Sequence, residues 1–341
     1  MLRAAFFLLA FCTFSYGQLD PTSVLLIGLN DFEAVDVPDT EDDQITKCEN
    51  SGLVPEYPID GTIFEAASAF INGMVMVCGG FDGQAVHAEC FALRPEPGDV
   101  WEPLKEMMYP VFRGGFSKFG NPEEEGEFFW VGGGSSDAVS AVSSSQIYDS
   151  STGTWFEGPE LPMALDGPCF AKLDNTHTLV TGGYQNGEAK NWIYDFDNYE
   201  FIPVGDFVGG DRMVHGCAAM ADGRVMVAGG YQGLNTPEAK VLNTVEFFDP
   251  ETKTWSEGPS LPAEGLDGNI LVGLSTGGWA GDVLLLGGHI PDSITGGDWI
   301  TSDSIWRFKT AENEWELTDY KMKLPRTHFT VVSTPFHCDE D

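Results

Sequence analysis

The sequence predicts an all-β protein arranged as a propeller, a ring of four-stranded antiparallel sheets. The first observation is composition, because 41 glycines and 20 prolines among 341 residues indicate many tight turns. The second is a repeat, in which an apolar run ending in Gly-Gly returns at roughly the 50-residue period of a propeller blade. The third is a pair of aromatic residues, seven positions apart, after each of the last four Gly-Gly pairs.

The Gly-Gly strands are regularly spaced along the chain. Their first glycines lie 54, 49, 47 and 58 residues apart. No copy has the sequence context of a phosphate-binding loop, so we expect the glycines to allow close packing of neighbouring strands. The five runs are Val75–Gly80, Phe128–Gly134, Thr178–Gly183, Val225–Gly230 and Leu284–Gly288.

Each aromatic pair flanks a short stretch rich in Asp, Thr, Pro and Gly, which predicts a hairpin with the two rings on its inner face. The first repeat keeps Trp101 but lacks an aromatic seven residues earlier. The four pairs are Tyr148 with Trp155, Tyr194 with Phe201, Phe248 with Trp255, and Phe308 with Trp315.

Gly-Gly after a hydrophobic strand, then Tyr or Phe, then Trp about seven residues on, resembles the kelch repeat. The resemblance covers roughly residues 60–333 and implies a β-propeller with a twisted four-stranded sheet in each blade. The repeat length leaves room for six blades. Ser23–Leu29 and Phe32–Pro38 read as two successive outer strands, and Thr327–Ser333 as an inner strand, so we expect the last blade to close between the two ends of the chain.

The N-terminus has the pattern of a secretory signal peptide. Arg3 is followed by an apolar stretch of 11 residues, Ala4–Phe14, which is too short to span a bilayer. Small residues at Ser15 and Gly17 predict cleavage before Gln18, so residues 18–341 would form one secreted domain. A membrane anchor or a buried strand is the alternative.

Six cysteines remain after residue 17, and an even number in an exported protein favours disulfides. Cys78 and Cys90 should be cross-strand neighbours joined through the turn at residues 81–85, with two buried thiols as the alternative. Cys48 with Cys338 would fasten the closing blade. The remaining pair, Cys169 and Cys217, occupies near-equivalent inner-strand positions, and whether neighbouring inner strands stand close enough to bridge is open.

The formal charge of −36 argues against nucleic acid and anionic membrane surfaces as partners, because both repel a polyanion. Acidic runs occupy Asp36–Asp43, Glu123–Glu127 and Asp339–Asp341. Carboxylates are ligands that Ca²⁺ accepts, but none of the runs follows the EF-hand order, and charge runs are usually solvated loops. No cofactor is predicted, and Ca²⁺ binding is left as the alternative.

No local motif assigns a metal site or a catalytic residue. The six histidines fall in no zinc or copper pattern, and no nucleophile motif occurs. A propeller can assemble a site from residues far apart in sequence, so convergence of distant histidines at the axis stays open.

The loops between the second and third strands of each blade vary in length, whereas the aromatic hairpins do not, and variable loops on a fixed scaffold are where recognition usually occurs. Asn235 and Trp299 lie on the two longest of these loops. The other predicted contacts are the residues that directly follow Gly-Gly, namely Phe81, Tyr184, Tyr231 and His289, and three arginines at or just before inner strands that could hold an anionic group, Arg113, Arg212 and Arg326. Alternatively, the aromatics cap blade ends and the arginines neutralise local carboxylates.

The sequence therefore predicts a secreted binding protein that presents propeller-face loops to an extracellular protein or glycan partner, without catalytic activity. One alternative is an acidic matrix or cation-associated protein, which Ca²⁺-dependent binding would favour. The other is an enzyme acting on a small molecule or sugar at the axis. A funnel lined by convergent Arg, Asp and His with perturbed pKa values would favour the enzyme.

Overall fold

The fold is an all-β propeller, described here from a computed structural model. The structure describes residues 24–27, 33–47, 55–59, 63–94, 99–121, 126–184, 190–233, 236–291 and 299–334, with backbone alone for 24–27, 291 and 299. The predicted signal peptide, Cys48, Cys338 and Asn235 lie outside these residues. No helix in the described part of the chain is long and apolar enough to cross a membrane.

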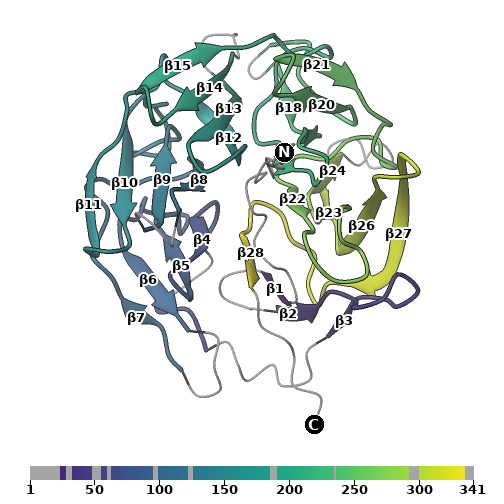
Figure 1. The fold of residues 1–341 in the computed structure, drawn as a ribbon, viewed down its shortest axis with the longest axis horizontal. Coiled ribbons are helices and arrows are strands. Elements are labelled where there is room, and N and C mark those ends of the chain that lie inside the picture. Colours follow the sequence, from purple (N-terminus) through teal and green to yellow (C-terminus); the bar gives the residue numbers. More distant parts are fainter. Residues whose placement is uncertain are drawn as a thin grey trace, which may run out of the picture.

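Five four-stranded antiparallel sheets are each made from one continuous stretch of chain, and they stand around a central axis (Figure 1). They are β4 (Ala67–Ile71), β5 (Met74–Cys78), β6 (Cys90–Leu93) and β7 (Glu102–Pro103); β8 (Gly115–Phe119), β9 (Phe128–Gly132), β10 (Ser145–Asp149) and β11 (Thr154–Glu157); β12 (Asp166–Lys172), β13 (His177–Tyr184), β14 (Asn191–Asp195) and β15 (Glu200–Pro203); β16 (Gly216–Ala219), β17 (Val225–Ala228), β20 (Val245–Asp249) and β21 (Thr254–Glu257); and β22 (Ile270–Gly273), β23 (Val283–Leu286), β26 (Ser304–Lys309) and β27 (Glu314–Lys321).

A further four-stranded sheet is shared between the two ends of the chain. Its order is β28 (Val331–Thr334), β1 (Val24–Ile27), β2 (Glu33–Asp36) and β3 (Thr46–Lys47). β1 pairs antiparallel with β28, with Leu25 opposite Ser333, and the yellow and purple strands lie side by side in Figure 1. The pairing of the chain ends that the sequence predicts is therefore present.

Two short hairpins extend the loops between second and third strands. β18 (Tyr231–Gln232) pairs with β19 (Lys240–Val241), and β24 (His289–Pro291) pairs with β25 (Trp299–Thr301). Both begin directly after a Gly-Gly pair, so they stand on the face of the propeller where the sequence predicts recognition loops.

The aromatic hairpins have the predicted register. Tyr148 lies directly opposite Trp155, and Phe248 directly opposite Trp255, with ring centroids 5.4 and 5.0 Å apart. The other two pairs are also directly opposite each other. Rings at these separations pack favourably, so each pair closes the outer hairpin of its blade.

The core lies between neighbouring sheets. Ile71 and Met76 of one blade pack in the same buried cluster as Phe129 of the next. Trp130 in β9 packs against Phe170 in β12, with ring centroids 4.5 Å apart. Alternation along each strand explains this arrangement, because successive side chains point to opposite faces and an internal blade is covered on both faces.

The Gly-Gly pairs connect adjacent blades through their backbones. The Gly80 N–H donates to the carbonyl oxygen of Val111 in the next blade at 2.8 Å, and Gly80 has a φ of 94°. A Cβ on Gly79 would stand 2.6 Å from the same carbonyl oxygen. Glycine is required because the backbone conformation is left-handed and leaves no room for a side chain. The same bond recurs at Gly134, Gly183, Gly230 and Gly288.

A ring of backbone hydrogen bonds encircles the axis just before the inner strands. Its residues all have a positive φ, between 51° and 67°. Each N–H donates to the carbonyl oxygen of the equivalent residue in the preceding blade, at 2.8 to 3.3 Å. The six members, in chain order, are Glu65, Arg113, Gly167, Val214, Gly268 and His328. The ring fixes the position of Glu65, Arg113 and His328 beside the axis.

Two disulfides are present in the described residues. Cys78 and Cys90 are cross-strand neighbours on β5 and β6 with sulfurs 2.08 Å apart, which confirms the predicted pair. Cys169 on β12 is bonded to Cys217 on β16, with Cα atoms 6.1 Å apart. Neighbouring inner strands are thus close enough to bridge, because strands of a propeller converge toward its axis.

Candidate functional site

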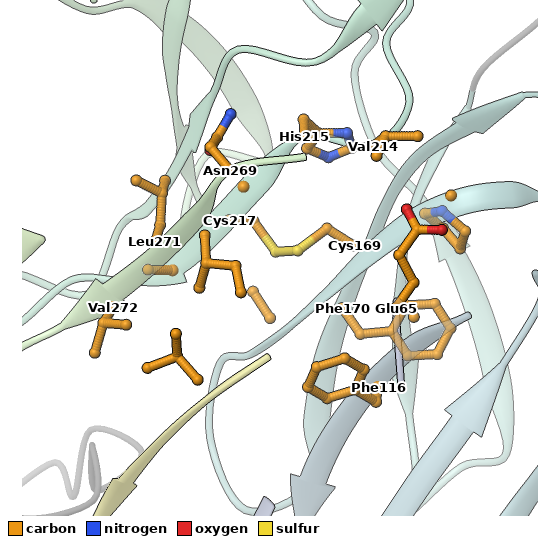
Figure 2. A pocket seen from close by; sticks show the side chains of 18 of the residues that line it. Glu65, Phe116, Cys169, Phe170, Val214, His215, Cys217, Asn269, Leu271 and Val272 are labelled. Atoms are coloured by element: carbon orange, nitrogen blue, oxygen red, sulfur yellow. A yellow bond between two sulfur atoms is a disulfide. The ribbon is translucent and has the colours of Figure 1, made fainter. Parts of the chain in front are cut away.

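A cavity of about 360 Å³ runs along the propeller axis. Its wall is formed by the inner strands, and Figure 2 shows the Cys169–Cys217 disulfide, Phe116, Phe170 and Leu271 around it. Glu65, Arg113 and His328 of the hydrogen-bonded ring also line the cavity. The cavity therefore combines a largely apolar wall with charged groups, which is the usual composition of a small-molecule site.

Ionisable side chains from four of the five blades and from the segment before β28 meet beside this cavity. Arg113 Nε lies 3.0 Å from Asp166 Oδ1 and 3.7 Å from Glu65 Oε2. His328 Nδ1 donates to Glu65 Oε1 at 2.5 Å. We call this group, together with Asp267 and His289 described next, the axial cluster.

Asp267 and His289 extend the cluster on the other side of His328. The ring centroids of His289 and His328 are 5.5 Å apart, and His289 Nδ1 lies 3.8 Å from Asp267 Oδ1. One nitrogen or oxygen donor from each of Asp267, His289 and His328 lies within 4.8 Å of the others. The side chains of these three residues retain 13 to 27% of their exposure, so the cluster is reachable from solvent.

The environment shifts the pKa values of the cluster in different directions. Burial raises the pKa of Asp166 and of Asp267, although Arg113 and His328 respectively oppose the shift. Burial lowers the pKa of His289, and the charge of His328 adds to this effect. Burial would also lower the pKa of His328, but the charge and hydrogen bond of Glu65 outweigh it and raise that pKa. Groups perturbed in this way collect at functional sites.

Two predicted contact residues, Arg113 and His289, belong to the axial cluster. Tyr184 and Tyr231 instead line a second recess of about 200 Å³ between neighbouring blades. The Phe81 ring packs against Phe112, with centroids 5.1 Å apart. The backbone of Trp299 pairs with Pro291 in the β24–β25 hairpin.

The three arginines do not act together as the sequence analysis expects. The Arg212 side chain is fully buried and forms an ion pair with Glu246 and hydrogen bonds with Thr244 and the Gly229 carbonyl. An anion-binding role for Arg212 does not fit this placement. Arg326 is half-buried, and its carbonyl oxygen accepts the Gly288 N–H at 2.8 Å.

The three arginines are placed differently because they occupy different positions in the repeat. Arg113 is a member of the hydrogen-bonded ring, whereas Arg212 and Arg326 lie two residues before the ring positions Val214 and His328. Their carbonyl groups receive the Gly-Gly N–H of a neighbouring blade. Only Arg113 therefore reaches the axial cluster in the described structure.

Glu65, Asp166, Asp267 and His328 were not predicted as site residues from the sequence. One signal was available: the tripeptide Leu-Asp-Gly occurs at residues 165–167 and again at 266–268, two repeats later. The glycine of each copy is a ring member, so the preceding aspartate is placed beside the axis in both. Glu65 and His328 carry no comparable pattern.

Among the predicted acidic runs, Asp36–Asp43 is described and includes a Thr40–Asp43 side-chain hydrogen bond. Glu127, at the end of the second run, forms an ion pair with Lys118 at 3.1 Å. Residues 122–125 and 335–341 lie outside the described structure. The described part of these runs therefore forms local contacts.

Comparison with known proteins finds the kelch motif in this chain. The Kelch motif family matches residues 212–262. Kelch-like protein 40 of Xenopus tropicalis is 23% identical over 204 residues, which is 58% of this chain and 31% of that protein. Kelch-like protein 23 of Homo sapiens is 28% identical over 201 residues, 57% of this chain and 32% of the relative. The match spans about a third of the length of these relatives.

A third relative is the N-acetylneuraminate epimerase of Haemophilus influenzae strain PittEE. It is 30% identical over 133 residues, 38% of this chain and 33% of that protein. Among solved structures, one titled "Structure of YjhT" superposes with a TM-score of 0.66 at 15% identity, covering 89% of this chain and 99% of the other. That likeness shows the propeller fold. The motif match and the kelch-like relatives together support placing this chain in the kelch-repeat family.

Proposed function

We propose that this chain is a secreted kelch-type propeller that binds a small glycan at the axial cluster. The observation that carries the proposal is the convergence of Glu65, Arg113, Asp166 and His328 from four blades beside one axial cavity. The proposal refines the protein or glycan partner expected from the loops. It also counts the sheet shared by the chain ends as a sixth blade that completes the wall of the cavity.

The size and lining of the cavity support a small ligand. About 360 Å³ lies in the range of sites that enclose small molecules. Phe116 and Phe170 offer apolar surface for the carbon–hydrogen face of a sugar ring (Figure 2). Carboxylates and imidazoles of the axial cluster can accept and donate hydrogen bonds with hydroxyl groups.

Arg113 directs the proposal toward an acidic sugar. Its contacts with Glu65 and Asp166 involve Nε, and the two Nη atoms carry four more N–H donors in a planar arrangement that matches a carboxylate. The relative that is an N-acetylneuraminate epimerase motivates N-acetylneuraminate as the first ligand to test.

The test is isothermal titration of the protein with N-acetylneuraminate, N-acetylglucosamine and galactose. Arg113→Ala should weaken binding of the acidic sugar at least tenfold. Arg224→Ala is the matched control, because Arg224 also pairs with a carboxylate, that of Asp222, but outside the axial cavity. Equal affinity of Arg113→Ala and the parent protein, or no binding of any sugar, would contradict the proposal.

A second candidate is catalysis on the bound sugar. The relative named as an epimerase and the perturbed pKa values of Asp166 and Asp267 favour it, because epimerising a sugar requires proton transfers to and from its oxygen atoms by positioned acids and bases. The measurement is proton NMR of N-acetylneuraminate with and without protein. Epimerisation at the spontaneous rate, in a protein that binds the sugar, would leave binding as the function.

Export is part of the proposal. The apolar segment Ala4–Phe14 with small residues before Gln18 motivates it, and the two disulfides fit an oxidising compartment. N-terminal sequencing of protein recovered from the medium of expressing eukaryotic cells should begin at Gln18. Retention of the intact N-terminus in the cell fraction would contradict it.

A further inference from the structure

The axial cluster contains a set of donors suited to a transition-metal ion. Asp267, His289 and His328 each contribute one donor atom, and the three donors lie within 4.8 Å of one another. Two imidazoles and one carboxylate form the ligand set that Zn²⁺ and similar ions prefer, whereas Ca²⁺ and Mg²⁺ prefer oxygen alone. We propose that these three side chains form a Zn²⁺-type site beside the axial cavity, with a fourth position open to water or ligand.

The distances allow coordination after small side-chain movements. Donors around a tetrahedral zinc ion with bonds of about 2.0–2.1 Å are separated by about 3.3 Å. His289 Nδ1 and Asp267 Oδ1 are already 3.8 Å apart. No pair of donors is more than 4.8 Å apart, so reaching that geometry requires each pair to close by at most about 1.5 Å.

Glu65 supplies the outer partner that a metal-binding histidine usually has. His328 Nδ1 donates to Glu65 Oε1 at 2.5 Å, which fixes the ring orientation and leaves Nε2 as the ligand atom. Histidine ligands in metalloproteins generally donate their other ring N–H to a carboxylate or carbonyl in this way. The ion pair of Glu65 with Arg113 holds that carboxylate in turn.

Charge and burial also favour a cation. The cluster contains three carboxylates, Glu65, Asp166 and Asp267, and a single guanidinium, Arg113. Asp267 Oδ1 is buried and has no hydrogen-bond partner in the part of the chain that the structure describes. A buried carboxylate oxygen without a partner is costly, and a bound cation would satisfy it.

The three ligands come from separate segments of the chain, two of them just before inner strands and one after a Gly-Gly pair. Asp267 precedes the inner strand β22, His289 starts the β24–β25 hairpin after a Gly-Gly pair, and His328 precedes β28. Backbone hydrogen bonds join these positions. The His289 N–H donates to the Asp267 carbonyl oxygen at 2.8 Å, and the Asp267 N–H donates to the His289 carbonyl oxygen at 3.2 Å. The His328 N–H donates to the carbonyl oxygen of Gly268 at 3.0 Å. The backbone therefore presents the ligands in a fixed arrangement.

The test measures metal binding without any sugar, so it does not depend on the proposed glycan function. Chelator-treated protein is dialysed against Zn²⁺ for stoichiometry and titrated with Co²⁺, whose visible absorption reports nitrogen and oxygen ligation. One tight equivalent is expected. His289→Ala and Asp267→Asn should each abolish the tight site, and Glu65→Gln should weaken it by about 10- to 100-fold through loss of the outer carboxylate.

His177→Ala is the matched control. His177 also has two carboxylates close by, with Nδ1 3.0 Å from Asp174 and Nε2 3.5 Å from Asp195, but it lies at the start of β13 rather than in the axial cluster. Its replacement should leave the tight equivalent unchanged. Absence of a tight equivalent in the parent protein, its loss in His177→Ala alone, or its displacement by Ca²⁺ at equal concentration would overturn the proposal.

Further measurements distinguish loss of metal binding from unfolding of a variant and from loss of glycan binding. Circular dichroism and thermal unfolding show whether each variant is folded, and Asp267→Asn retains the shape of the side chain if His289→Ala unfolds. Arg113→Ala should lose glycan binding but keep the metal equivalent, since Arg113 is not a ligand. A folded Asp267→Asn that still binds one equivalent contradicts the site.

Discussion

The backbone N–H of Glu65 donates a hydrogen bond to the carbonyl oxygen of His328 at 2.8 Å, across 263 residues of sequence. Their side chains also meet, since His328 Nδ1 donates to Glu65 Oε1. The same pair of residues therefore completes the ring of backbone bonds around the axis and joins two parts of the axial cluster. Closure of the propeller and assembly of the site depend on the same contact.

The close packing around the second glycine of a Gly-Gly pair predicts a large effect of one methyl group. Gly134 and Gly73 both have a φ of 75°. A Cβ on Gly134 would stand 2.4 Å from the Phe112 carbonyl oxygen, whereas a Cβ on Gly73 would have no heavy atom of the described structure within 4 Å beyond its chain neighbours. Gly73→Ala should cost about 1 kcal/mol through backbone strain alone, and Gly134→Ala about 3 kcal/mol or more. Urea unfolding measures both. Equal losses would show that the close approach has no energetic weight.

Burial of Arg212 predicts a structural rather than a ligand-binding role. Glu246→Gln leaves a buried guanidinium without its ion-pair partner, which should lower the free energy of unfolding by about 3–5 kcal/mol. Asp222→Asn removes the partner of the half-exposed Arg224 and should cost less than about 1 kcal/mol. Chemical denaturation of both variants is the measurement. A Glu246→Gln variant as stable as the parent would refute the structural role.

The two disulfides should stabilise the protein unequally. Cys169–Cys217 joins residues 48 apart and Cys78–Cys90 joins residues 12 apart. In the chain-entropy description, their removal lowers the free energy of unfolding by about 4 and about 3 kcal/mol respectively. The double variants Cys169→Ala/Cys217→Ala and Cys78→Ala/Cys90→Ala are compared by urea unfolding. A smaller loss for the longer link would show that native-state effects dominate.

His215 predicts that stability falls in mild acid. Its two ring nitrogens are buried without hydrogen-bond partners in the described structure, and burial, aided by the charge of Arg212, holds the pKa of His215 well below 6.5. The unfolded chain therefore binds a proton that the folded protein does not. The contribution of His215 to the free energy of unfolding should be fully present above about pH 6.5. Below that pH the free energy of unfolding should fall by up to about 1.4 kcal/mol per pH unit.

The comparison is between the parent protein and His215→Gln, unfolded in urea at several values between pH 5 and 7.5. The variant lacks the titrating ring, so its stability should change less steeply over this range. Parallel curves for the two proteins would exclude His215 as the source of the acid sensitivity.

Much of the scaffold could be predicted from the sequence because its signals are local. The apolar runs, the Gly-Gly pairs and the aromatic residues seven positions apart each report backbone conformation within a few residues. Cys78 and Cys90 could be paired for the same reason, since a single hairpin places them opposite each other. The strands at the chain ends, β1, β2 and β28, were also recognisable as incomplete copies of the repeat.

Only the tertiary structure decided the site. Glu65, Asp166, Asp267 and His328 are about one or two repeats apart, and apart from the Leu-Asp-Gly tripeptide around the two aspartates no local pattern distinguishes them from solvated charges. The curvature of the ring brings them together, just as convergence of the inner strands places the Cα atoms of Cys169 and Cys217 6.1 Å apart. The tertiary structure also decides that Arg113 reaches the axis, whereas Arg212, two residues before the ring position Val214, is buried. Local sequence specifies each blade, whereas contacts between blades decide which side chains face one another.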